Sequence, residues 1–193
     1  MKPQIVFIHG GDSFAGIEQF HVALRSWTYL PGQPERKRWR DWLVTELSDT
    51  HEFFLPAMPC KENADYTAWS IWFEKFLPYL HDGVVLIGHS LGGGFLLRYL
   101  TENKLSIIVT QLHLVAPCVY EVPGFNIDLT TWKGFASDVT ETHLWHSSDD
   151  TIVPIAQSER FAAVYPPAQL HQFSDRFHFL TETFPELLAE IQK

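Results

Sequence analysis

Cysteine is scarce in this chain, and the two that occur, Cys60 and Cys118, lie far apart. Neither belongs to a C-x-x-C pair, so a thiolate metal site or redox dithiol is not indicated. One disulfide could join them, but two free thiols in a reducing compartment fit this usage better. Long apolar runs are also lacking, since the N-terminal run 5–8 is far too short for a secretory signal or a membrane span. We therefore expect a cytoplasmic protein with no membrane contact.

Positive charge is the next shortage, with 14 Lys and Arg against 23 Asp and Glu and a net charge of −9. Nucleic-acid binding proteins need basic patches to neutralise phosphates, so nucleic acid is not an expected partner. The 46% apolar and 19% charged residues are typical of a globular chain rather than a disordered one. A length of 193 residues without internal repeats fits a single domain spanning residues 1–193.

Short apolar runs alternate with helical stripes along the whole chain. This alternation predicts an α/β fold with a mostly parallel central sheet and helices on both faces. The segment 118–139 has no clear period and is too short for more than a flap, which predicts little or no lid. Thr183 and Glu186 are spaced as in a capping box at the start of the last helix. The predicted strands are 5–8, 51–55, 84–87, 107–115, 143–146 and 170–173, and the predicted helices span 17–27, 39–47, 66–80, 91–100, 154–162 and 183–191.

The motif Gly88-His89-Ser90-Leu91-Gly92 joins the strongest predicted strand to a helix. A G-x-S-x-G sequence in that context is typical of a nucleophile elbow, a turn so sharp that side chains at the glycine positions would collide with their surroundings. The turn places Ser90 at a helix N-terminus, where unpaired N–H groups favour a developing anion. We predict Ser90 as nucleophile. The alternative is an ordinary strand–turn–helix junction that holds a serine by chance.

Backbone N–H groups near Ser90 are the candidate oxyanion hole. The N–H of Leu91, directly after the nucleophile, is the first expected donor. The loop His9-Gly10-Gly11 after the first strand is placed to supply the second, from Gly11 or Asp12. A plain glycine turn is an equal alternative for either residue. His9 itself is expected to be a structural histidine.

A serine nucleophile needs a general base and a carboxylate that orients the base. In such folds the acid follows the serine along the chain, and the histidine follows the acid. Asp149 and Asp150 come after the strand 143–146, at the sheet edge where Ser90 is expected. Asp150 begins the pattern D-x-x-V-P and is preferred, and Asp149 is then a turn residue. Asp128 and Asp138 are weaker candidates because no clear strand precedes either.

His178 lies between Phe177 and Phe179, after the last predicted strand and before the last helix. This position predicts the general base, although a histidine between two phenylalanines is often simply packed. His171 is the alternative, but it falls within a strand. His143 and His146 are three apart on a strand and should face opposite sides of the sheet, so no metal site is expected.

These motifs together resemble the α/β-hydrolase superfamily, and most closely its small retinoblastoma-binding-protein-9-like (YdeN-like) serine hydrolases. The resemblance covers the whole chain and implies a Ser-His-Asp enzyme without cofactor. One departure is Phe177, because a glycine commonly precedes the base. The other lies around Cys118, where the L-x-C-x-E motif that binds pocket proteins is absent, so no such partner is implied.

Two functions follow from these residues. The first is a serine hydrolase that cleaves a carboxylic ester, or a thioester or amide, in a small acyl substrate through an acyl-enzyme. The second is a hydrolase-like module that binds a protein with little turnover. Phe125, Trp132, Phe135 and Phe177 are candidates to line an acyl pocket, with core packing as their alternative. The oligomeric state is not indicated.

Overall fold

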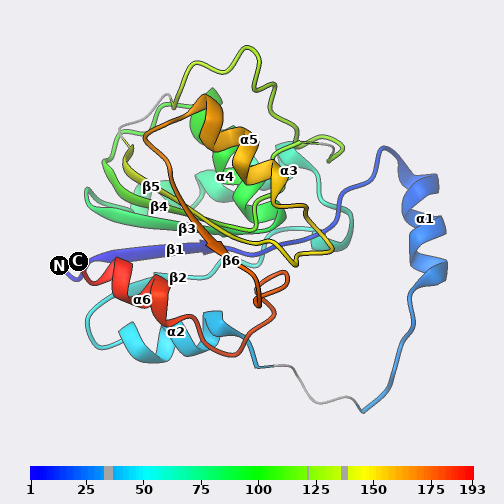
Figure 1. Cartoon of the computed structure of the whole chain (residues 1–193), viewed down its shortest axis with the longest axis horizontal. Helices are drawn as coiled ribbons and strands as arrows, with labels where there is room; N and C mark the ends of the chain where they lie inside the picture. The colour runs from blue at the N-terminus through cyan, green and yellow to red at the C-terminus, as the bar shows by residue number, and fades with distance from the viewer. Residues whose placement is uncertain (33–36, 121, 136–138) are drawn as a thin grey trace.

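The centre of the molecule is a wholly parallel six-stranded sheet in the order β2-β1-β3-β4-β5-β6 (Figure 1). The computed structural model describes residues 1–32, 37–120, 122–135 and 139–193. The predicted α/β fold is confirmed, and each predicted strand forms. Because all strands run the same way, the loops that follow them meet at one edge. The strands are β1 (Gln4–Ile8), β2 (Glu52–Phe54), β3 (Val84–His89), β4 (Val109–Val115), β5 (Val139–Ser147) and β6 (Gln169–Phe173).

Helices cover both faces of this sheet, as predicted. One face carries α3 (Tyr66–Glu74), α4 (Leu91–Glu102) and α5 (Ala156–Val164), and the other carries α2 (Trp39–Leu47) and α6 (Pro185–Ile191) (Figure 1). Strand side chains alternate between the two apolar cores that result, so Leu86 belongs to one and its neighbour Ile87 to the other. Burial on both faces explains why β3 is a continuous apolar run.

The helix α1 (Ile17–Ser26) stands apart from both layers (Figure 1). It forms as predicted, but none of its residues is buried, and Val22 is 66% exposed. Its rings contact one another and the preceding loop, with Phe20 between Phe14 and Trp27. Helical periodicity predicted the helix here without indicating which surface, if any, it packs on.

Several predicted helix boundaries are wrong, and α5 begins at Ala156 rather than at Pro154. The helix expected over 66–80 ends at Glu74 and is followed by a 3₁₀ turn, Leu77–Tyr79, that contains Pro78. Proline lacks the N–H that a continuing α-helix needs and collides with the preceding turn. The last helix has Phe184, not Thr183, at its N-cap, without a side-chain cap. Pro185 begins it, where the missing N–H has no intrahelical partner in any case.

The connection from β4 to β5 contains neither helix nor strand within its described residues. Phe125 in its middle is fully buried against the Trp69 ring, which fixes this segment to the core beside α3 and agrees with the prediction of little or no lid.

Cys60 and Cys118 are both free thiols. Throughout the described parts of the chain, every helix is too short or too polar to cross a membrane.

Candidate active site

Ser90 occupies a strained turn between β3 and α4. Its backbone has φ 56° and ψ −122°, outside the regions that non-glycine residues usually adopt. The Ser90 N–H donates to the Val115 carbonyl at 2.8 Å, and the Ser90 carbonyl accepts from the Cys118 N–H at 3.1 Å. These hydrogen bonds to the end of β4 and the loop beyond it hold the turn in place.

The glycines of the elbow are required by crowding, as the sequence predicted. A Cβ on Gly88 would lie 2.6 Å from the Gly92 carbonyl oxygen, and one on Gly92 would lie 2.2 Å from the Ile8 carbonyl oxygen. Both obstacles are backbone atoms and cannot swing aside. A Cβ on Gly94 would similarly lie 2.0 Å from the Cys118 carbonyl oxygen. Helix α4 therefore begins in direct contact with the ends of β1 and β4.

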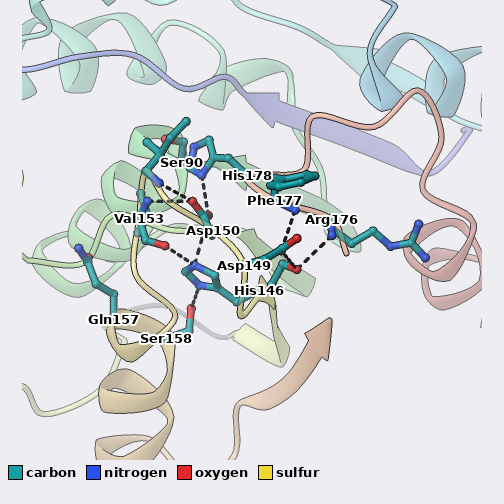
Figure 2. Close-up of polar contacts among 12 residues, drawn as sticks. Ser90, His146, Asp149, Asp150, Val153, Gln157, Ser158, Arg176, Phe177 and His178 are labelled. Atoms are coloured by element: carbon teal, nitrogen blue, oxygen red, sulfur yellow. Dashed lines mark hydrogen bonds and ion pairs between the residues drawn. The ribbon is translucent and has the colours of Figure 1, made fainter. Parts of the chain in front are cut away.

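Asp150 follows β5, and its side chain is completely buried. One oxygen, Oδ1, accepts the N–H groups of Ile152 and Val153 at 2.8 and 2.9 Å, while Oδ2 accepts Nδ1–H of His178 at 2.7 Å (Figure 2). Burial alone would raise the pKa of this carboxyl group. The hydrogen bonds from His146, His178 and Val153 outweigh that effect and hold the pKa of Asp150 well below its ordinary value. The group is thus an anion aimed at the imidazole.

His146 is a second imidazole beside this carboxylate that the sequence analysis did not assign. Its Nε2–H donates to the Val153 carbonyl at 2.9 Å and lies 3.4 Å from Oδ2 of Asp150, while Nδ1 accepts from the Ser158 hydroxyl at 2.7 Å (Figure 2). The carbonyl partner fixes the tautomer. The feature of the sequence that could have indicated this role is the position of His146, at the end of a predicted strand and four residues before the acid.

His178 is held at both its ring and its backbone. The ring binds Asp150 through Nδ1, which leaves Nε2 as the free nitrogen. The His178 carbonyl accepts Nε2–H of His89 at 3.0 Å. Burial, together with repulsion from His178, lowers the pKa of His89 to about 3, so this residue is a neutral donor. His89, the variable position of the G-x-S-x-G motif, therefore ties the base loop to the elbow, a contact that sequence reasoning missed.

The Ser90 hydroxyl is near the base but turned toward a thiol. Its Oγ lies 3.8 Å from Sγ of Cys118, and none of the hydrogen bonds among the described residues joins it to His178. Burial raises the pKa of Cys118 to about 11, so the neighbour is a neutral thiol. Ser90 and His178 are seen together above the Asp150 carboxylate in Figure 2. Such contacts are often long without substrate, and a rotation about the Ser90 Cα–Cβ bond reorients Oγ.

Solved structures of the same architecture extend over nearly the whole chain. The ydeN gene product of B. subtilis matches with a TM-score of 0.72 at 20% identity, over 98% of this chain and 97% of that one. The mouse α/β hydrolase domain-containing protein 10 matches with a TM-score of 0.62 at 15% identity, over 100% and 88%. The chain has the α/β-hydrolase fold. The esterase PE8 also matches, with a TM-score of 0.65 at 14% identity, over 100% and 92%. Scans against protein-family models and against curated proteins found no match.

In this α/β-hydrolase fold the loop after β1 lies against the nucleophile. A Cβ on Gly10 would be 3.0 Å from Cβ of Ser90. Leu91 is the first residue of α4, so its N–H lacks an intrahelical acceptor and can face a ligand. The Asp12 N–H already donates to the Lys61 carbonyl at 2.8 Å, and the prediction of Asp12 as an oxyanion donor is therefore wrong. Gly11 remains the candidate for the second donor.

His9 has the structural role expected of it. Its Nδ1–H donates to the Gly10 carbonyl at 2.7 Å, and its Nε2 accepts the Met58 N–H at 2.8 Å. Both ring nitrogens are thus used to shape the loop. Neither remains free for proton transfer.

Asp149, the less favoured candidate for the acid, faces away from the imidazole of His178 but accepts two hydrogen bonds of its own. Its Oδ1 accepts the Ser147 hydroxyl and the Phe177 N–H, the latter at 2.9 Å (Figure 2). The Ser147 oxygen in turn accepts the Arg176 N–H at 3.1 Å. Adjacent aspartates therefore hold different parts of one loop: Asp150 binds the ring of His178, and Asp149 the backbone before it.

Three of the four residues predicted to line an acyl pocket instead pack in or against the apolar core on the α4 face of the sheet. Phe125 is fully buried. The Trp132 Nε1–H donates to Oγ1 of Thr101. Thr101 lies three turns along α4 from Ser90, a distance of about 16 Å. Phe135 packs on the rings of Trp132 and Tyr165. These aromatic rings serve packing, and the part of the segment that carries Trp132 and Phe135 lies beside the far end of α4 rather than at its N-terminus. Phe177, next to His178 and 58% exposed, is the one left at the site.

The other candidate acids and bases lie elsewhere. Asp128 is exposed, and hydrogen bonds from Thr130 and Thr131 lower its pKa. Asp138 lies outside the described residues. His171 accepts or donates a hydrogen bond at 3.1 Å to Nδ1 of His143, within the sheet rather than at its loop edge. None of these described contacts reaches Ser90.

One group of side chains offers metal-ligand atoms. His143, His171 and Glu190 place such atoms within 4.8 Å of one another. His143 lies four residues, or about 13 Å, before the end of β5 at Ser147, on the α6 face. His146 points to the opposite face, toward Ser158 of α5, as the strand spacing predicted. The distance along β5 therefore separates this group from the candidate active site, and the carboxylate of Glu190 is already paired with Lys193.

Two cavities lie outside the Ser90 site. One, of about 370 Å³, borders the β1 loop and includes His9, Arg40 and Lys61 in its lining. The other, of about 330 Å³, lies at the far end of α4 and includes Thr101 and Trp132. Neither is lined by the serine, the acid or the base. The candidate site is therefore located by the side chains of Ser90, His178 and Asp150 and not by a cavity.

Proposed function

We propose that this protein is a serine hydrolase that cleaves a carboxylic ester, thioester or amide bond through an acyl-enzyme, with Ser90, His178 and Asp150 as the triad. The observation that carries the proposal is the 2.7 Å hydrogen bond between a buried, anionic Asp150 and His178, beside a serine on a strained elbow. A role in packing alone would not need a buried carboxylate aimed at an imidazole next to a nucleophile.

The first half of the reaction uses the free nitrogen of the imidazole. Ser90 Oγ attacks the substrate carbonyl carbon as Nε2 of His178 takes the hydroxyl proton. Asp150 keeps the opposite nitrogen protonated and stabilises the imidazolium that forms. His178 then gives the proton to the leaving alcohol, thiol or amine as the carbon–leaving-group bond breaks, and the acyl group stays on Ser90.

The second half removes this acyl group with water. His178 takes a proton from water, the resulting hydroxide attacks the acyl carbonyl, and the proton returns to Ser90 Oγ as the acid leaves. In both halves the N–H groups of Leu91 and Gly11 stabilise the oxyanion, a contribution worth about 3 kcal/mol per donor in well-studied cases. None of these steps needs a cofactor. The esterase PE8 has the same fold at 14% identity, and its name supports the choice of an ester as substrate.

A fluorophosphonate probe tests the proposal directly. We expect labelling of the wild-type protein at Ser90, no labelling of Ser90→Ala, and full labelling of Ser148→Ala, a matched change at an exposed serine before the two aspartates. Hydrolysis of short and medium acyl p-nitrophenyl esters should fall by about 10⁴-fold or more in Ser90→Ala with unchanged folding. A folded wild-type protein that neither labels nor turns over any ester, thioester or amide would favour the binding module instead.

A further inference from the structure

The two residues on either side of His178 both adopt left-handed backbone conformations. Phe177 has φ 49° and Phe179 has φ 52°. For a residue with a Cβ this conformation is strained and persists only where the surroundings compensate for it. The position of the proposed base therefore depends on what holds these two neighbours.

Phe179 is held by burial of its side chain. It is 2% exposed, and its ring packs against Phe173 and Phe184 with centroids 5.7 and 4.9 Å apart. Loss of this packing would be needed to release the backbone. The strain at Phe179 is thus compensated by the core below the loop.

Phe177 has no such support from its side chain, which is 58% exposed. Its N–H instead donates to Oδ1 of Asp149 at 2.9 Å, a hydrogen bond to a charged acceptor. The preceding N–H, that of Arg176, donates to Ser147 Oγ at 3.1 Å, and the Ser147 hydroxyl donates to the same Asp149 oxygen. Two successive amides of the base loop are therefore fixed by one carboxylate and its serine (Figure 2).

We propose that Asp149 is a positioning residue for His178, which it holds through the left-handed backbone of Phe177. The inference rests on the proposed function, because it assigns Asp149 to the same reaction. Glycine adopts positive φ without strain, so a glycine at position 177 would need no such carboxylate. Asp149 is thus the feature that lets this chain carry phenylalanine before its base.

The test is a double-mutant cycle between positions 149 and 177. With Phe177 present, Asp149→Ala should lower kcat by about tenfold with little change in KM, because the base is misplaced while substrate binding persists. In the Phe177→Gly background the same Asp149→Ala change should cost less than about twofold. Asp175→Ala is the matched control. It removes an exposed carboxylate of the same loop, one whose ion-pair contact is with the Arg176 guanidinium at 3.5 Å, and should leave kcat unchanged.

A second measurement does not depend on turnover. Amide hydrogen exchange at Phe177 should become faster in Asp149→Ala and stay as in the wild type in Asp175→Ala. An equal loss of kcat in both backgrounds, or unchanged kcat or Phe177 exchange in Asp149→Ala, overturns the proposal. If the wild type neither labels at Ser90 nor turns over, the proposed function fails, and the exchange result still decides whether Asp149 holds the His178 loop.

Discussion

The loops after β5 and β6 differ from the segment after β1 in how they are held. Hydrogen bonds to Asp149 and Asp150 join the loop after β5 to the loop that carries His178. His146 holds the acid loop through the Val153 carbonyl, and His89 holds the base loop through the His178 carbonyl. The chain after β1 passes the glycines of the oxyanion loop and continues into α1, in which no residue is buried. Polar contacts hold the acid and base loops and also the start of the loop after β1, but only the chain after β1 goes on into an exposed helix.

This difference matches the two demands on a hydrolase site. Proton transfer between Ser90 and His178 requires heavy atoms within hydrogen-bond distance, so the acid and base loops must be closely positioned. Substrate recognition tolerates more variation and is commonly carried by exposed segments on a rigid scaffold. We therefore expect substitutions that remove the contacts anchoring these loops to affect chemistry or folding strongly, and substitutions in α1 to have small effects on both.

The largest expected effect separates the two adjacent aspartates. Asp150→Asn should lower kcat by about 10⁴-fold, because the amide no longer stabilises the imidazolium or fixes the tautomer of His178. Asp149→Asn keeps an oxygen that accepts the Phe177 N–H and should lower kcat by less than about tenfold. Steady-state kinetics on the same ester measure both. A greater loss from Asp149→Asn would show that Asp150 is not the acid.

A pair of glycine substitutions compares how much the elbow and α1 each contribute to stability. Gly92→Ala places a Cβ 2.2 Å from the Ile8 carbonyl oxygen and should lower the free energy of unfolding by about 3 kcal/mol or prevent folding. Gly16→Ala, at the N-cap of α1, meets no atom within 4 Å and should change it by less than about 1 kcal/mol. Urea unfolding followed by circular dichroism gives both values. Similar losses would contradict the view that α1 is weakly coupled to the core.

Sequence patterns predicted the parts of this molecule that are local along the chain. The apolar runs gave the strands because a strand buried on both faces must be apolar throughout, and the crowding at Gly88 and Gly92 follows from one short motif. Asp150 and His178 were placed by strand ends and chain order. Their 2.7 Å contact then follows from the parallel sheet, which brings both loops to one edge.

Contacts between loops were beyond the same reasoning. Asp149 looked like a turn residue because its partner, the Phe177 N–H, is a backbone group 28 positions away. His89 and His146 have partners that only the folded chain identifies. The stripe on α1 predicted a helix but not its exposure, since periodicity gives the direction of an apolar face and not what covers it. At the last helix Pro185 competed with the apparent cap at Thr183 and determined the start.

The effect that appears only gradually, as the pH is lowered, concerns the histidine that links the elbow to the base loop. Burial lowers the pKa of His89 to about 3, against 6.5 ordinarily, so between these values the unfolded chain binds a proton that the folded chain does not. Stability should therefore fall as the pH falls below 6.5, and His89 alone should contribute up to about 1.4 kcal/mol per pH unit. His89→Gln keeps a donor for the His178 carbonyl but cannot titrate, so it should reduce the slope by that amount. Urea unfolding from pH 7 to pH 4 measures the slope, and an unchanged slope in His89→Gln would mean that the imidazole is not held neutral between the elbow and the base loop.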